Sequence, residues 1–127
     1  MDGNYIMVFM TASTEEEAAN IGHNVVKEGL AACCNIVTKI RSIYVWKDKL
    51  CDETEALCVF KTRAMLFDRL KKRIQELHSY EVPEIIAVDI KDGLDEYLGW
   101  IDSVTSRART SRGRGHVIFA PKAKTRP

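Results

Sequence analysis

The feature that most constrains the fold of this chain is a pair of long strand-like segments joined by a very short polar turn. The first segment runs from Leu30 to Trp46 and the second from Leu50 to Thr62, with Lys47-Asp48-Lys49 between them. Both segments are rich in Val, Ile, Tyr, Trp and Phe, which suit a pleated, half-buried surface. Asp tolerates the left-handed backbone that a tight turn requires. The pattern predicts one β-hairpin, with arms longer than the roughly three to ten residues of most strands.

Part of so long a hairpin should project beyond the core of its own chain. Exposed strand edges aggregate unless they are paired or covered. In addition, Leu30–Val37 and Leu57–Phe60 are largely apolar at consecutive positions, as in strands that are buried on both faces. We therefore expect a second copy of the chain to cover the face that its own helices leave open.

Strands and helices alternate through the first two thirds of the chain. The apolar run Tyr5–Met10 predicts a strand that is buried on both faces. Ser13, with Glu16 three residues later, predicts a helix cap, and Gly29 predicts the end of that helix. Thr62 is expected to cap a second helix, because apolar residues recur after it at helical spacing: Leu66, Leu70, Ile74 and Leu77.

The remaining elements complete a recognisable order. A strand is predicted over Glu84–Ile90 and a helix over Leu94–Val104, and His116–Ala120 could form a further small strand. Strand, helix, strand, strand, helix, strand is the βαββαβ order of the ferredoxin-like plan. The sequence thus predicts an α+β, ferredoxin-like sandwich with a long projecting hairpin and an extra C-terminal helix.

Length and charge divide the chain into one domain and a tail. A chain of 127 residues is long enough for a single hydrophobic core, which we place at residues 1–105, leaving 106–127 as a basic tail. From Ser103 onward there are seven basic residues and no acidic one, whereas the part before it carries a net charge of −6. An acidic body does not predict nucleic-acid binding, and a short basic tail is usually solvated.

We expect neither a secretory signal nor a membrane-spanning segment in this chain. Its first residues are polar, and no apolar run approaches the roughly 20 residues that span a bilayer. We expect a soluble, cytoplasmic protein with no membrane partner. Its four cysteines should then be reduced and mostly buried. Cys33 and Cys34 are neighbours in a strand, so their side chains should point to opposite faces and not chelate one metal ion together.

Five motifs, in order, resemble the CutA family of divalent-cation tolerance proteins: LAACCNI at 30–36, SIYVWKDK at 42–49, KT at 61–62, LHSYEVPEII at 77–86 and YLGWI at 97–101. The resemblance extends from about Tyr5 to about Thr105. It implies a tight homotrimer with hairpins interlocked between subunits, and a link to copper and other divalent ions. The family's architecture is also similar to that of the trimeric PII signalling proteins.

The resemblance further implies a metal site. Some members bind copper through a His and a Glu similar to His78 and Glu84, together with a Cys near the end of the first strand, where this chain has Met10. A thioether suits Cu(I), and His and carboxylate suit Cu(II), with Zn(II) bound more weakly. The family usually has Pro at Ser79, so the segment after His78 should be looser here. It usually has Gly at Asp48, where Asp should still make the turn. The alternative for His78 is an imidazole that only bonds the last carbonyls of its helix.

A second candidate site is an intersubunit cleft. Its expected lining is aromatic and charged, and consists of Tyr44, Trp46, Glu53, Glu55, Lys61 and Tyr80. Glu53 and Glu55 are two residues apart in a strand and so share a face. Lys61 could hold an anion or pair with a carboxylate. The alternative is simple packing between subunits.

No catalytic motif is present, so we do not expect an enzyme or an organic cofactor. Three functions stay open. The chain could be a trimeric protein that binds copper or another divalent ion and takes part in the response to metal ions. It could be a PII-like signalling trimer with a small anionic ligand in its clefts. It could also be an anchoring trimer that recruits an unidentified protein.

Overall fold

A computed structural model describes residues 4–105 of the chain, so the expected strand at His116–Ala120 and the basic tail lie outside the described residues. The described part contains four strands, three α-helices and one 3-10 turn. In chain order these are β1 (Tyr5–Ala12), α1 (Glu15–Lys27), β2 (Cys33–Trp46), β3 (Lys49–Arg63), η1 (Ala64–Leu66), α2 (Phe67–Leu77), β4 (Ile85–Asp89) and α3 (Asp95–Thr105). The predicted α+β class and order of elements are confirmed.

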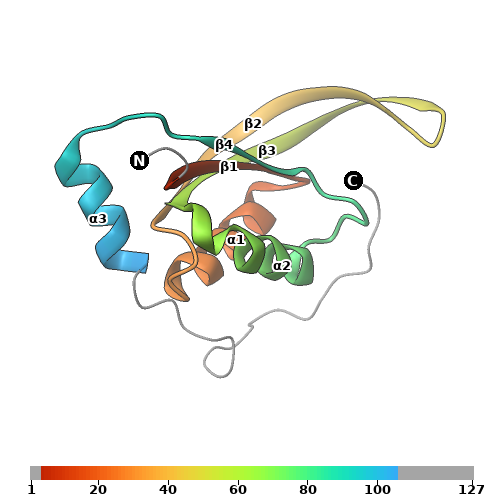
Figure 1. Cartoon of the computed structure of the whole chain (residues 1–127). Coiled ribbons are helices and arrows are strands. Elements are labelled where there is room, and N and C mark those ends of the chain that lie inside the picture. Colours follow the sequence, from red (N-terminus) through yellow and green to blue (C-terminus); the bar gives the residue numbers. More distant parts are fainter. Residues whose placement is uncertain (1–3, 106–127) are drawn as a thin grey trace.

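One sheet organises the described residues. Its strand order is β2-β3-β1-β4, and every neighbouring pair is antiparallel. Helices α1 and α2 both lie against the same face of this sheet, while α3 lies beyond one end of it (Figure 1). Within residues 4–105 the two helices therefore leave the other sheet face open. No helix of residues 4–105 is long and apolar enough to cross a bilayer.

The hairpin of β2 and β3 extends well past the helices (Figure 1). The last pair that β1 makes with β3 is Ala12 with Ala56, so the rest of β3 toward the tip pairs only with β2. At the tip, Trp46 pairs with Lys49, and Lys47 and Asp48 have positive φ angles of 52° and 65°. Two left-handed residues make the primed turn that matches strand twist. The turn is thus one residue shorter than predicted.

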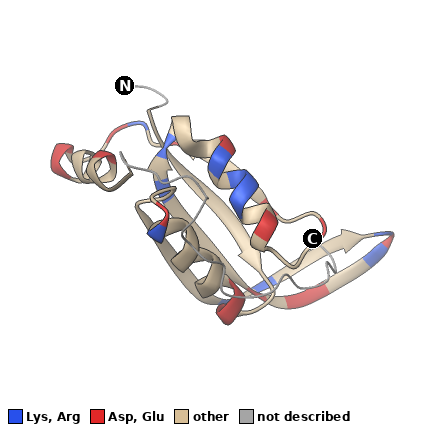
Figure 2. Cartoon of the chain, turned by 90° about the horizontal axis from the view of Figure 1, so that it is seen from below, with Lys and Arg blue, Asp and Glu red and all other residues tan. Residues whose placement is uncertain are grey.

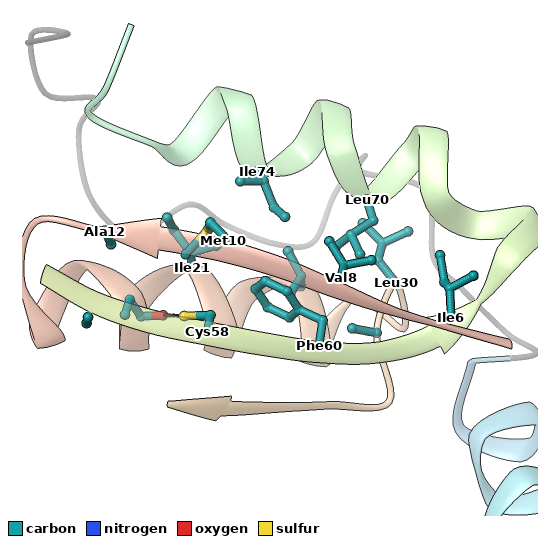
Figure 3. Packing of buried hydrophobic residues seen from close by; sticks show 14 residues of the cluster. Ile6, Val8, Met10, Ala12, Ile21, Leu30, Cys58, Phe60, Leu70 and Ile74 are labelled. Carbon is teal, nitrogen blue, oxygen red and sulfur yellow. Dashed lines mark hydrogen bonds between the residues drawn. The ribbon is translucent and has the colours of Figure 1, made fainter. Parts of the chain in front are cut away.

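The hydrophobic core fills the space between the sheet and helices α1 and α2 (Figure 3). Strand β1 supplies every second residue to it, which contradicts the expectation that Tyr5–Met10 is buried on both faces. Tyr5, Met7 and Phe9 point to the open face and stay half-buried. Burying one large apolar side chain stabilises the fold by about 1.5–3 kcal/mol. The core residues are Ile6, Val8, Met10, Ala12, Ala18, Ile21, Val25, Leu30, Ala31, Ala56, Cys58, Phe60, Leu70 and Ile74.

Two predicted helix caps are wrong. Thr14, not Ser13, caps α1, because its hydroxyl oxygen accepts a hydrogen bond from the Glu17 amide at 3.0 Å. Thr62 lies inside β3 and not at the start of a helix. Its buried hydroxyl donates to the carbonyl oxygen of Leu30 at 2.8 Å, where the chain leaves α1 and enters the sheet. A cap residue must be free to bond its own helix, and Thr62 is already used in the core.

Ion pairs support the helical layer. Lys, Arg, Asp and Glu lie along α2, at the start of α1 and along the hairpin (Figure 2). Arg73 of α2 makes a two-pronged contact with the Glu28 carboxylate after α1, with atoms 2.9 Å apart, and both side chains are nearly buried. The basic face of α2 thus contributes to packing between the helices.

Helix α3 is held at the end of the sheet by polar contacts. The Tyr5 hydroxyl donates to the Asp102 carboxylate at 2.7 Å. Arg63 donates to both the hydroxyl and the carbonyl oxygen of Thr105, each at 2.8 Å. The predicted third helix is therefore present and starts one residue later than expected.

Candidate functional site

The segment that follows α2 packs against the end of β1 and the base of the hairpin. His78 ends α2 and is 1% exposed. Its Nδ1 accepts a hydrogen bond from the Tyr80 amide at 3.0 Å, which fixes the proton on Nε2, and Nε2 donates to the Thr11 carbonyl oxygen at 2.7 Å. A backbone N–H can only donate, so this imidazole is neutral as placed. Neither nitrogen is open to a metal ion unless one of these bonds breaks.

Glu17 of α1 binds the same segment through its carboxylate. Its carboxylate accepts from the Ser79 amide at 2.7 Å and from the Ser79 hydroxyl at 3.0 Å, and the Ser13 hydroxyl adds a third bond at 3.1 Å. Burial alone would raise the pKa of Glu17, but the bonds from Ser79 bring the pKa below its ordinary value of 4.5. A proline at position 79 could not donate this amide bond. The expectation that Ser79 loosens the segment is therefore wrong: it ties the segment down.

Tyr80 connects the segment to the hairpin. Its ring lies 4.7 Å from the His78 ring, centroid to centroid, and its hydroxyl donates to a Glu55 carboxylate oxygen at 2.5 Å. Tyr80 and Glu55 are 1% and 5% exposed. Glu84 is exposed, and both partial burial and the Glu55 charge raise the pKa of Glu84. The Tyr80 hydroxyl and the Glu55 carboxylate thus meet where the hairpin leaves the body, and the Glu55 charge acts on Glu84.

The other residues of the predicted cleft lie elsewhere. The Tyr44 hydroxyl donates to Glu53 at 3.0 Å along the hairpin, and Trp46 sits at the tip, its ring 5.6 Å from Lys47 Nζ. Lys61 pairs in the sheet with Met7 and Cys33 and its ammonium bonds Asn35, near the other end of β3. Within the described part of one chain, Lys61 therefore does not lie beside Glu53 or Glu55. The alternative in which the cleft binds a small anion gains no support from this geometry.

Met10 lies inside the core and is 0% exposed, between Cys58 of β3 and Ile85 of β4. Within residues 4–105, no group of three or more His, Cys, Asp or Glu side chains is close enough to hold a metal ion. The ligand roles of His78, Glu84 and Met10 stay predictions. Sequence reasoning missed Glu17 and Thr11. Only the tertiary packing of α1 and β1 against residues 78–80 reveals their part.

The open sheet face and the hairpin carry an extended apolar surface. Large side chains that one chain leaves uncovered lie on β2, β3 and β4, and they are Val37 (47% exposed), Ile43 (62%), Val45 (67%), Leu50 (76%), Ile86 (54%) and Val88 (45%). Helix α3 and the residue before it add four more: Leu94, Tyr97, Trp100 and Val104. Monomeric proteins rarely expose contiguous apolar patches above a few hundred Å². This surface has the character of an interface.

Comparison with known proteins agrees with the sequence motifs. Residues 6–104 match the family model of the CutA1 divalent ion tolerance protein. The chain is 43% identical over 95 residues to the divalent-cation tolerance protein CutA of Thermus thermophilus, which covers 75% of this chain and 92% of the relative. It is 39% identical over 100 residues to the chloroplastic protein CutA of Arabidopsis thaliana, covering 79% of this chain but only 55% of that relative.

Solved structures show the same fold. The divalent cation tolerance protein (Cut A1) from Thermus thermophilus superposes with a TM-score of 0.77 at 42% identity, over 80% of this chain and 98% of that one. CutA1 from Oryza sativa superposes with a TM-score of 0.79 at 38% identity, over 82% and 95% of the two chains. The family model covers the sheet, both packed helices and most of α3. The chain therefore belongs to the CutA1 divalent ion tolerance protein family.

Proposed function

We propose that this chain forms a homotrimer that takes part in the response to divalent metal ions, copper foremost. The observation that carries the proposal is the apolar surface over the open sheet face and the hairpin. Val45 and Leu50 near the tip are 67% and 76% exposed in one chain. Leaving such side chains in water forgoes roughly 1.5–3 kcal/mol each. A second and third copy of the same surface would bury them, as the family resemblance implies.

The hairpin is well suited to reach a neighbouring subunit. Beyond the last β1 pair at Ala56, its two strands have no third strand beside them within the described part of one chain. Its two strands nevertheless pair as far as the tip, with one register shift between Val37 and Ile40, and Arg41 and Asp52 are joined by two hydrogen bonds of 2.8 and 2.7 Å. A two-stranded ribbon is only marginally stable alone in water. Contact with other subunits would supply the missing burial.

Matched substitutions test this assembly. Val45→Glu places a charge on the hairpin, whereas Val26→Glu makes the same change on the outer side of α1, where Val26 is 37% exposed. We expect Val45→Glu to lower the particle mass and the unfolding temperature together, because obligate oligomers often lack a stable folded monomer. Val26→Glu should leave the mass unchanged. An unchanged mass for Val45→Glu would refute a trimer built through the hairpin.

For the divalent ion we propose Glu84 as the accessible ligand, with Glu55 beside it. Glu84 is exposed and close enough to Glu55 for the two charges to repel, and a divalent cation would relieve that repulsion. His78 can join only by releasing the Tyr80 amide. Leaving a buried donor unpaired costs about 1–3 kcal/mol, so we expect moderate affinity. Copper(II) should bind more tightly than zinc(II).

Calorimetric titration with Cu(II) and Zn(II) tests this site. Glu84→Gln removes a carboxylate charge and keeps the shape, and Glu81→Gln makes the same change at an exposed position three residues away. We expect Glu84→Gln to weaken Cu(II) binding and Glu81→Gln to leave it unchanged. His78→Gln should weaken it further if the imidazole does rotate out. Equal affinity in wild type and Glu84→Gln would rule the site out.

We also propose a cytoplasmic location. All four cysteines are free thiols, which fits a reducing compartment. Cell fractionation with antibody detection, alongside cytosolic and membrane markers, tests this, and recovery outside the cytosolic fraction would contradict it.

A further inference from the structure

Helix α3 carries an apolar surface beside the one that packs against the sheet. Ile101 and Thr105 are fully buried on the packed side. Tyr97, Trp100 and Val104 recur at helical spacing on an adjacent side, where they are 41%, 40% and 41% exposed. The rings of Tyr97 and Trp100 lie 5.4 Å apart, centroid to centroid, so they form one surface. We call these three exposed residues the α3 flank.

The α3 flank lies far from the hairpin tip. Figure 1 shows α3 beyond one end of the sheet and the tip of the hairpin beyond the other. The Tyr97 hydroxyl lies 3.8 Å from the sulfur atom of Cys33, which begins β2. This contact places one border of the flank next to the sheet and leaves Trp100 and Val104 farther along the helix. The hairpin of the same chain therefore does not cover the flank.

The surroundings of the α3 flank are acidic. Residues 92–105 include four acidic residues and no basic one, and these are Asp92, Asp95, Glu96 and Asp102. Figure 2 shows Asp and Glu, and neither Lys nor Arg, on α3. Asp92, Asp95 and Glu96 are exposed and lie at the end where α3 begins. An occupant that fits this surface has an apolar part for the flank and a basic part for these carboxylates.

The chain continues from α3 with a segment of that composition. Residues 106–127 follow Thr105 directly and contain seven basic residues and no acidic one. Within them is the apolar run Val117–Ala120, which includes one large aromatic side chain, Phe119. Lys122 and Lys124 come shortly after this run. The charge of the tail is thus opposite to that of the helix to which it is joined.

The length of the tail and the order of its residues fit a return along α3. The helix has 11 residues and is therefore about 16 Å long, at about 1.5 Å per residue. Residues 106–116, which precede the apolar run, can span up to roughly 36 Å. A segment that returns from the last residue of α3 toward its first meets the α3 flank before it meets the acidic residues. The tail has its apolar run and then its two lysines in that same order.

We propose that the tail of this chain binds its own α3, with Val117–Ala120 on the α3 flank and Lys122 and Lys124 beside Asp95 and Glu96. A short linker gives an effective concentration of about millimolar, so weak binding is enough to keep such a segment in place. The proposal does not depend on the proposed response to metal ions. A second copy of the chain is the other occupant that the experiment must distinguish.

The test measures how strongly acrylamide quenches the fluorescence of Trp100 in the full chain. The chain has two tryptophans, so Trp46→Phe leaves Trp100 as the only reporter. Phe119→Glu then places a charge in the apolar run. Ala108→Glu adds the same charge to the tail ahead of that run and is the matched control. Light scattering confirms that each variant keeps the particle mass of the Trp46→Phe parent.

A second pair of variants tests the charges. Lys122→Glu combined with Lys124→Glu reverses the basic part of the tail without changing its apolar run. Trp100→Phe makes Trp46, at the hairpin tip, the only reporter. Its quenching should be the same with and without the two lysine substitutions, because the proposed contact lies at the other end of the sheet.

We expect Phe119→Glu and the double lysine variant each to raise the quenching constant of Trp100 and to shift its emission to longer wavelength. Ala108→Glu should change neither quantity. An unchanged quenching constant of Trp100 in either test variant would overturn the proposal, because the ring would then be open to water, or covered by something else, whatever the tail does. A constant that falls in the parent as protein concentration rises would also overturn it, since a second copy would then cover the flank.

Discussion

The contact between Tyr80 and Glu55 should be the most costly single hydrogen bond to remove near the candidate site. Tyr80→Phe deletes only the hydroxyl that donates to Glu55 at 2.5 Å and keeps the buried ring beside His78. No cavity larger than one oxygen atom results, so the packing loss is small. The cost comes from the carboxylate, which is 5% exposed and loses a donor. Hydrogen bonds to charged groups contribute about 1.5–3 kcal/mol, so we expect a loss near 2 kcal/mol.

Tyr44→Phe provides the matched control for this measurement. It removes the same kind of bond, from a tyrosine hydroxyl to the Glu53 carboxylate at 3.0 Å, where both residues are only half-buried. We expect it to cost about 1 kcal/mol or less. Urea unfolding followed by tryptophan fluorescence, at one fixed protomer concentration, gives both free energies. A loss for Tyr80→Phe no larger than that for Tyr44→Phe would refute the argument from burial.

Two further predictions follow from single contacts, and a third concerns the tail. Because the folded pKa of Glu17 lies below 4.5, its contribution to stability is present above that pH and is lost as pH falls through the folded value. Acid titration followed by circular dichroism should show wild type losing more stability than Glu17→Gln as pH falls below 4.5, and equal losses would contradict this. Thr62→Val leaves the Leu30 carbonyl without its buried donor and should cost about 1–3 kcal/mol in urea unfolding; no measurable cost would show that the bond is replaced. Deleting Arg107–Pro127 should leave the number of chains per particle and the Cu(II) affinity unchanged. Loss of assembly would show that the tail is needed to hold the subunits together.

Local patterns were sufficient for the elements of the fold. The periodicity of the α2 apolar residues reports which side of that helix meets the core. The unbroken apolar run Tyr5–Met10 predicted a strand, but it did not show that only every second residue faces the helices. A tight turn depends mainly on the backbone conformation of its own residues, here Lys47 and Asp48. The hairpin could therefore be predicted with an error of one residue at its tip. Thr62 shows the limit of the method. Its sequence context fits a helix cap, but its hydroxyl donates to the carbonyl oxygen of Leu30, which lies 32 residues earlier in the chain.

The candidate site was harder to predict, because its residues come together only through tertiary contacts. Sequence spacing predicted that His78 and Glu84 could share a site. It could not show that the Thr11 carbonyl and the Tyr80 amide already occupy both imidazole nitrogens. The proximity of Glu55 to Glu84 depends on where the hairpin crosses the end of β1. Glu17 carried no signal beyond its place in the first turn of α1, where acidic residues are common.

The central claim is that the open sheet face and the hairpin are buried against further copies of the same chain. Multi-angle light scattering of the purified protein, coupled to size-exclusion chromatography at micromolar concentration, tests it directly. The account predicts one species with three times the chain mass of 14.4 kDa and no detectable monomer. A folded monomer of 14.4 kDa, stable on dilution, would contradict it.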